Sequence, residues 1–132
     1  MKKILFVVIA ITLLGCKKDE KSNNKLNVVT TTTMITDLVK NIGGDNINLQ
    51  GLMGSGVDPH LYKASEGDVT KLVNADIIFY NGLHLEGKLV EVFEKMERSG
   101  KTPIALTDVI DKSTLIGSYY FASNYDPHVW FN

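Results

Sequence analysis

From Leu26 onward, short apolar or β-branched runs alternate with segments whose apolar residues recur at helical spacing. The runs are typical of strands, and the three-to-four-residue repeat is typical of amphipathic helices. Strands are predicted over residues 26–30, 47–53, 76–80 and 103–106, with helices around 35–42, 65–73 and 85–96. Alternating strands and helices build parallel sheets with right-handed crossovers. The pattern therefore predicts an α/β fold, a single lobe with a four-stranded parallel sheet flanked by helices on both faces.

Local signals mark the ends of these predicted elements. Gly43-Gly44 stops the first helix, and Ser65 and Asp68 have the spacing of a capping box, with Asp in place of the usual Glu. Residues 107–125 show no clean period, which predicts a functional or lobe-bridging element. Met34 and Met53 are expected to fill the core. Each helix is predicted to have one apolar face, which would be the buried one, made by Ile35, Leu38, Val39 and Ile42, by Val69, Leu72 and Val73, and by Leu85, Leu89, Val92, Phe93 and Met96.

The start of the chain has the pattern of a secretory signal peptide, residues 1–15. A positive start leads into an apolar run over residues 4–14, shorter than the ~20 residues of a transmembrane helix. Residues 13–16 (LLGC) resemble a bacterial lipobox, which predicts lipidation of Cys16; a plain signal peptide with an incidental cysteine also fits. Residues 16–25 are polar and are expected to form a lipid-anchored tether. The mature protein is therefore expected to be extracytoplasmic and membrane-anchored, on the periplasmic or cell-surface side.

The charge balance and the cysteine count bear on nucleic-acid binding and on disulfide formation. The 14 basic and 15 acidic residues give a formal net charge of -1, which argues against a nucleic-acid surface. The single cysteine permits no internal disulfide. We expect a monomer without a nucleic-acid partner.

The three histidines all follow predicted strands. In open α/β sheets, ligands bind beyond the carboxyl ends of the strands, so His60, His84 and His128 are expected at the same edge. His60 and His128 each follow an Asp-Pro pair. Proline restricts its own backbone and that of the preceding residue, so each imidazole extends from a stiff turn. The neighbouring aspartate either caps that turn or accepts a hydrogen bond from the ring nitrogen that is not on a metal.

These two motifs predict a metal site. Asp-Pro is also a common turn starter, so one such histidine alone would be read as a solvated loop residue. Two copies at one sheet edge favour His60 and His128 as metal ligands. His84 is weaker: it is expected beside the site, or exposed at the start of a helix.

The donor types limit the ion. Imidazole with oxygen donors suits zinc, manganese or iron, whereas copper(I) prefers sulfur. Ligating imidazole must be neutral, so affinity is expected to weaken in acid. Two imidazoles do not complete a four-coordinate zinc site, so carboxylates or residues beyond Asn132 must supply further donors.

Three segments, residues 54–62, 74–86 and 125–132, resemble the metal-ion solute-binding proteins of ABC importers, the zinc and manganese group called TroA-like. The resemblance implies two lobes joined by a long helix, with one divalent zinc or manganese ion between them. It implies that His60 and His128 are ligands, that His84 is not, and that a histidine or glutamate and an aspartate of the C-terminal lobe complete the set. It also implies delivery to an ABC permease with its ATPase. Residues 26–132 are thus expected to be the N-terminal metal-binding lobe, the C-terminal lobe being absent from this chain.

Other interpretations fit parts of the pattern. A two-histidine site with an open position also suits a metal-dependent hydrolase, although the sequence has no Gly-x-Ser-x-Gly, His-Glu-x-x-His or phosphate-loop motif. No catalytic residue is predicted. A metal-binding surface adhesin or passive buffer remains an alternative. The aromatic residues around the second motif would either shield the metal or, as we expect for most, pack in the core or an interface; they are Tyr119, Tyr120, Phe121, Tyr125, Trp130 and Phe131.

Overall fold

The computed structural model describes residues 25–131. The predicted signal peptide, Cys16 and all but the last residue of the predicted tether lie outside this range. None of the helices in residues 25–131 is long and apolar enough to cross a membrane. The elements in chain order are β1 (Leu26–Thr30), α2 (Thr33–Gly43), η1 (Gly44–Asn46), β2 (Ile47–Gly51), α3 (Glu66–Asn74), β3 (Ile77–Tyr80), α4 (Val90–Arg98), β4 (Ile104–Ala105), η2 (Leu106–Val109), η3 (Lys112–Thr114) and η4 (Val129–Phe131), where η marks a 3₁₀ turn.

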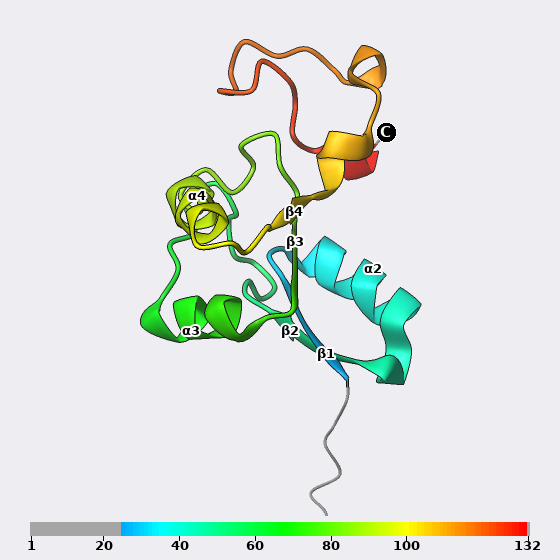
Figure 1. Cartoon of the computed structure of the whole chain (residues 1–132). Coiled ribbons are helices and arrows are strands. Elements are labelled where there is room, and N and C mark those ends of the chain that lie inside the picture. The colour runs from blue at the N-terminus through cyan, green and yellow to red at the C-terminus, as the bar shows by residue number, and fades with distance from the viewer. Residues whose placement is uncertain (1–24, 132) are drawn as a thin grey trace, which may run out of the picture.

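The four strands form one parallel sheet in the order β2-β1-β3-β4. α2 lies on one side of the sheet, and α3 and α4 lie on the other (Figure 1). This confirms the predicted α/β lobe with helices on both faces. Since every strand runs the same way, the loops that follow β1, β2, β3 and β4 leave from one edge.

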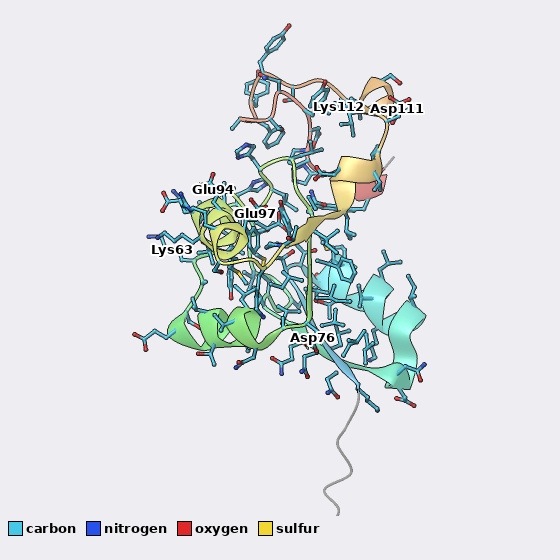
Figure 2. All side chains as sticks on the ribbon, in the orientation of Figure 1. Lys63, Asp76, Glu94, Glu97, Asp111 and Lys112 are labelled. Carbon is cyan, nitrogen blue, oxygen red and sulfur yellow. The ribbon has the colours of Figure 1, made fainter. Side chains whose placement is uncertain are left out.

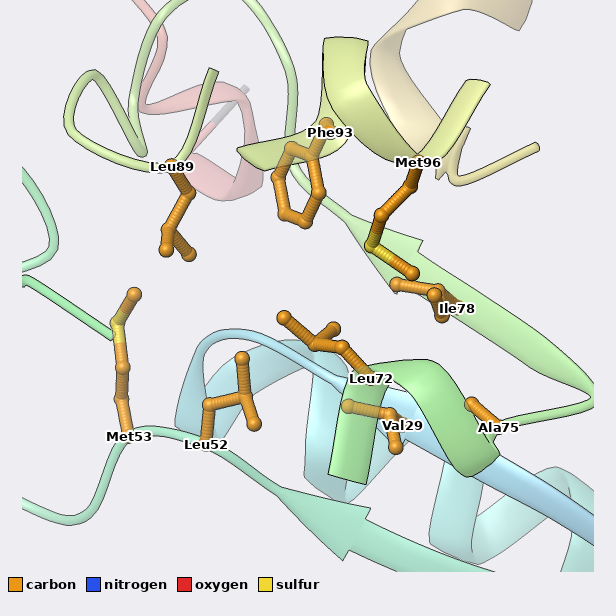
Figure 3. Packing of buried hydrophobic residues seen from close by; sticks show 9 residues of the cluster. All are labelled: Val29, Leu52, Met53, Leu72, Ala75, Ile78, Leu89, Phe93 and Met96. Atoms are coloured by element: carbon orange, nitrogen blue, oxygen red, sulfur yellow. The ribbon is translucent and has the colours of Figure 1, made fainter. Parts of the chain in front are cut away.

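The main core lies between the sheet and the α3/α4 layer (Figure 3). β1 and β3 are the two interior strands, and Val29 and Ile78 are buried where they face this layer. Buried aliphatic, aromatic and methionine side chains fill the space, namely Val29, Leu52, Met53, Leu72, Ala75, Ile78, Leu89, Phe93 and Met96.

The opposite face is less completely covered. α2 buries Ile35, whereas Leu38 and Ile42 are 52% and 78% exposed, contrary to the prediction. Leu38 and Ile42 instead border an open apolar pocket whose other walls include Ile77 and Phe79. The predicted burial of Met34, Val69 and Val73 is also wrong, because helical spacing places a residue on a face without deciding what covers that face.

Two predicted element boundaries shift in the structure. β2 ends at Gly51, before Leu52 and Met53. Leu85 and Leu89 are fully buried as predicted but precede α4, which begins at Val90. The backbone at Gly82, Leu83 and His84 has positive φ (91°, 49° and 60°), which no α-helix accommodates. Residues 83–89 form turns, and α4 begins only after them. A Cβ at residue 82 would also collide with the Thr107 hydroxyl, so this turn requires glycine.

Charged side chains lie at the periphery, as the labelled residues of Figure 2 show. Glu94 and Glu97 extend from α4, and Lys63 from the segment before α3. Asp111 and Lys112 belong to the turn around η3. All five are exposed, which leaves the interior of the lobe to apolar residues and a few hydrogen-bonded polar ones.

The predicted capping box of α3 is confirmed and is larger than a two-residue box. The backbone N–H of Asp68 donates to Ser65 Oγ at 3.2 Å, and the Asp68 carboxylate accepts from the backbone N–H of Ser65 at 3.0 Å. The same carboxylate accepts from the Ser65 hydroxyl, the Tyr62 hydroxyl and Lys71 Nζ at 2.6, 2.8 and 3.0 Å. Burial alone would raise the pKa of Asp68, but these hydrogen bonds outweigh it and lower the pKa well below 3.8. Burial and the Asp68 carboxylate raise the pKa of Tyr62 to about 12, so Tyr62 remains a donor at neutral pH.

Asp68→Asn is expected to lower the free energy of unfolding at pH 7 by about 2 kcal/mol, because the charged acceptor of four donors is lost. A carboxyl group whose pKa is lowered by folding stabilises the protein above its unfolded pKa, and that stabilisation is lost as the pH falls toward the folded pKa. The difference between wild type and Asp68→Asn should therefore shrink below pH 3.8. Urea unfolding at pH 7 and at steps below pH 4 measures this, with exposed Asp45→Asn as the control. A difference independent of pH would contradict the assignment.

Candidate metal centre

The two Asp-Pro-His motifs share one local hydrogen bond, from the histidine backbone N–H to the aspartate side chain. Asp58 Oδ1 accepts from the backbone N–H of His60 at 2.9 Å, and Asp126 Oδ1 accepts from the backbone N–H of His128 at 3.0 Å. An aspartate that bonds the backbone two residues on makes a turn without help from the rest of the fold. This is the first of the two roles predicted for these aspartates.

The structure brings the rings of His60 and His128 together. Their Nε2 atoms are 3.4 Å apart, although the residues are separated by 68 positions in the sequence. The ring centroids are 5.4 Å apart with an interplanar angle of 64°, and both side chains are partly buried. The predicted convergence of the two motifs at one sheet edge is therefore found. Their role as ligands stays a prediction.

His84 lies apart from this pair. It is exposed, on a backbone with φ of 60°, and makes no hydrogen bond or ring contact with His60 or His128 in the described part of the chain. Within residues 25–131, no group of three or more His, Cys, Asp or Glu side chains is placed to hold a metal ion. The two imidazoles are thus a pair, and two nitrogens leave a four-coordinate ion short of donors.

The two rings differ in how they are held. His128 Nδ1 lies 2.6 Å from Asp126 Oδ1, so the carboxylate fixes the ring as well as the turn. Hydrogen bonds from the backbone and then the ring of His128 lower the pKa of Asp126, which keeps the acceptor ionised. With its proton on Nδ1, a neutral His128 ring presents the lone pair of Nε2 toward His60. Asp126 therefore plays both predicted roles.

A buried amide connects the His128 turn to the sheet. Asn81, directly after β3, donates from Nδ2 to the carbonyl of Pro127 at 3.0 Å and to that of Gly82 at 3.1 Å. The carbonyl of Asn81 in turn accepts from the backbone N–H and hydroxyl of Thr107, at 3.1 and 2.8 Å. The position of the His128 motif is therefore set by β3 and by the turn after β4.

A buried carboxylate joins the ends of two strands at this edge. Glu86 is 2% exposed, and its Oε1 accepts from the Thr31 hydroxyl at 2.6 Å and from the backbone N–H of Asn81 at 2.8 Å. Its Oε2 accepts from the backbone N–H of Gly82 at 3.3 Å. Thr31 follows β1 and Asn81 follows β3, so one side chain ties together the ends of the two interior strands. Sequence reasoning assigned no structural role to Glu86 or Asn81; the available signal was their place in residues 74–86, one of the three segments that carry the family resemblance.

Aromatic rings surround the imidazole pair. Phe121 stacks on His60 with centroids 5.9 Å apart and an interplanar angle of 17°, and meets His128 edge-on at 5.6 Å. Trp130 meets His128 edge-on at 5.3 Å. Tyr119 and Tyr120 are 102% and 96% exposed. The expectation that most of these aromatic residues pack in the core or an interface is therefore wrong for these two. Phe121 is therefore a site residue that the cluster alone did not single out.

Residues 28–132 match the family model described as ZnuA, zinc-uptake complex component A periplasmic. The chain belongs to this family. Among curated ZnuA-family relatives, it is 44% identical over 135 residues to the manganese-binding lipoprotein MntA of Bacillus subtilis (strain 168), covering 100% of this chain and 43% of that protein. It is 50% identical over 115 residues to the zinc-binding protein TroA of Treponema pallidum (strain Nichols), covering 87% and 36%.

Solved structures agree with the family assignment. The periplasmic zinc-binding protein TroA from Treponema pallidum superposes with a TM-score of 0.74 at 51% sequence identity, covering 81% of this chain and 38% of that structure. The four-stranded lobe described above is thus a known part of the ZnuA-family fold. The chain spans less than half the length of the relatives that it matches.

Glu86→Ala is expected to lower the free energy of unfolding by at least ~2 kcal/mol, because three buried donors lose their acceptor. Urea unfolding followed by circular dichroism measures the loss, and exposed Glu91→Ala on α4 is the matched control. A loss no larger than that of the control would show that the ends of β1 and β3 do not depend on this carboxylate.

Proposed function

We propose that this chain is the N-terminal metal-binding lobe (residues 26–132) of an extracytoplasmic substrate-binding protein, which captures a zinc or manganese ion and delivers it to an ABC permease with its ATPase. His60 and His128 are the ligands that this lobe contributes. The observation that carries the proposal is the approach of the two Nε2 atoms to 3.4 Å.

The spacing of the two nitrogens fits a shared ion. Zinc lies ~2.0–2.1 Å from imidazole nitrogen, and in a tetrahedral site two such nitrogens are about 3.4 Å apart. Without an ion, two neutral rings whose Nε2 lone pairs face each other repel. The repulsion is absent only when one ring carries a proton on Nε2. A cation between the rings removes that repulsion, and the bond from Asp126 leaves Nε2 of His128 available for it.

The remaining donors come from outside this lobe in our proposal. The matched relative MntA is named a manganese-binding lipoprotein and TroA a zinc-binding protein, and this chain covers 43% and 36% of them. A second lobe of matching size would complete the coordination and enclose the ion. The family and these names support a carrier, and we assign no catalytic residue.

Lipidation of Cys16 would keep the protein near the importer. The tether over residues 16–25 is polar and would reach at most ~35 Å when extended. The lipoprotein name of MntA supports this anchor. The lobe would then collect metal ions close to the membrane surface that holds the permease.

Replacing either ligand is expected to weaken metal binding. His60→Ala and His128→Ala in the full-length protein should each lower the affinity for zinc or manganese by at least ~10-fold. Even substitution of a residue that only hydrogen-bonds to a metal ligand lowers metal affinity on that scale. His84→Ala is the matched control, because this third histidine is exposed and forms no metal-holding group with the pair within residues 25–131. Competition with a metal chelator measures the three affinities. Unchanged affinity in both ligand variants would refute the proposal.

The two aspartates are expected to differ in their effect on the same affinity. Asp126→Asn removes the carboxylate that fixes the His128 ring and should weaken binding roughly 10-fold or more. Asp58→Asn should weaken binding less, because the Asp58 carboxylate accepts from the backbone N–H of His60 and, within the described residues, does not reach the ring. The same competition titration compares the pair. Equal losses in the two variants would show that the ring contact of Asp126 is unimportant.

A further inference from the structure

The ring of His60 lacks the support that His128 receives. Both histidines follow an Asp-Pro pair, and both aspartates accept the histidine backbone N–H. Only Asp126 also reaches the ring nitrogen Nδ1, at 2.6 Å. Within residues 25–131, the ring of His60 has no hydrogen-bond partner except Nε2 of His128. Among the described residues, no carboxylate orients the ring of His60.

Phe121 packs against the face of the His60 ring. Its ring lies nearly parallel to the His60 ring, at 17°, with centroids 5.9 Å apart. Offset stacking at this separation is a favourable aromatic geometry, and it restricts rotation of the imidazole about its side-chain bonds. Phe121 also meets His128 edge-on at 5.6 Å, so one ring is in contact with both imidazoles.

The segment that carries Phe121 is itself held in shape. An antiparallel bridge joins Gly117 and Tyr125, and the backbone N–H of Ser118 donates to the carbonyl of Asn124 at 2.9 Å. The N–H of Asn124 donates to the carbonyl of Phe121 at 2.9 Å, which closes a turn around the phenylalanine. The loop ends at Asp126, whose N–H donates to the carbonyl of Ile116 at 2.8 Å. Backbone hydrogen bonds therefore tie the segment that carries Phe121 to the start of the second motif.

We propose that Phe121 is the positioning residue for His60, stacking on its imidazole to aim Nε2 at the ion in the way that the Asp126 carboxylate does for His128. The expected effect of Phe121 on metal affinity rests on the proposed function, whereas its effect on the orientation of the His60 ring does not. An apolar ring against the face of His60 also shields one side of the ion from water.

The test compares two substitutions of Phe121 with one substitution of Tyr119, all in the full-length protein. Phe121→Leu keeps an apolar side chain without a ring, Phe121→Tyr keeps the ring, and Tyr119→Leu removes an exposed ring from the same loop as the matched control. Chelator competition gives the zinc and manganese affinities. Phe121→Leu is expected to weaken binding roughly 2- to 10-fold, whereas Phe121→Tyr and Tyr119→Leu should bind within about 2-fold of wild type.

A second measurement needs no metal. In the metal-free protein, NMR should show nuclear Overhauser contacts between the rings of His60 and Phe121, and Phe121→Leu should shift the His60 ring resonances. Rescue by Phe121→Tyr of both the affinity and the His60 resonances would support a positioning role. Thermal unfolding of each variant shows whether the fold itself has changed.

The outcomes separate the two proposals. If His60→Ala weakens binding and Phe121→Leu does not, the positioning role is wrong and the proposed function stands. If Phe121→Leu and Phe121→Tyr lose affinity and thermal stability equally, Phe121 only packs and the positioning role is wrong. If no variant and no histidine matters for metal binding, the proposed function is wrong, and the presence or absence of the ring contacts in the metal-free protein still decides the role of Phe121.

Discussion

The carboxyl edge of the sheet is held by one buried carboxylate, that of Glu86. Its two oxygens accept from Thr31 after β1 and from the backbone of Asn81 and Gly82 after β3. A buried carboxylate is costly unless its lone pairs are used, and here three donors use them. Because Asn81 is placed in this way, its amide reaches the carbonyl of Pro127 and positions the second histidine motif. The imidazole pair therefore depends on a hydrogen-bond chain that begins inside the lobe.

Parallel topology explains why two distant motifs meet. β2 and β4 are the outer strands of the sheet, and the histidine motifs follow them on the same edge. If each motif simply continued its strand, the two histidines would be separated by the width of the two interior strands, β1 and β3. The long segment after β4 closes this gap by folding back through the Gly117–Tyr125 bridge. The irregular stretch that showed no sequence period is thus the element that brings His128 and Phe121 to His60.

The two motifs show the limit of local reasoning. Their three residues are the same, and in each the aspartate side chain accepts from the histidine backbone N–H, at 2.9 and 3.0 Å. The rings nevertheless have different partners, a carboxylate for His128 and a phenyl ring for His60. A three-residue pattern specifies the turn, because the turn is made within those residues. It does not specify the partner of the ring, which comes from elsewhere in the chain.

The sequence by itself determined the strand and helix order, the parallel sheet, the capping box of α3 and the two Asp-Pro-His turns, since each rests on short-range periodicity or contacts within a few residues. Tertiary structure decided which apolar faces are covered: Leu72 is buried while Leu38 and Ile42 remain exposed. It also decided the start of α4 and the roles of Glu86, Asn81 and Phe121. These depend on contacts between residues far apart in the chain, for which no local pattern carries information.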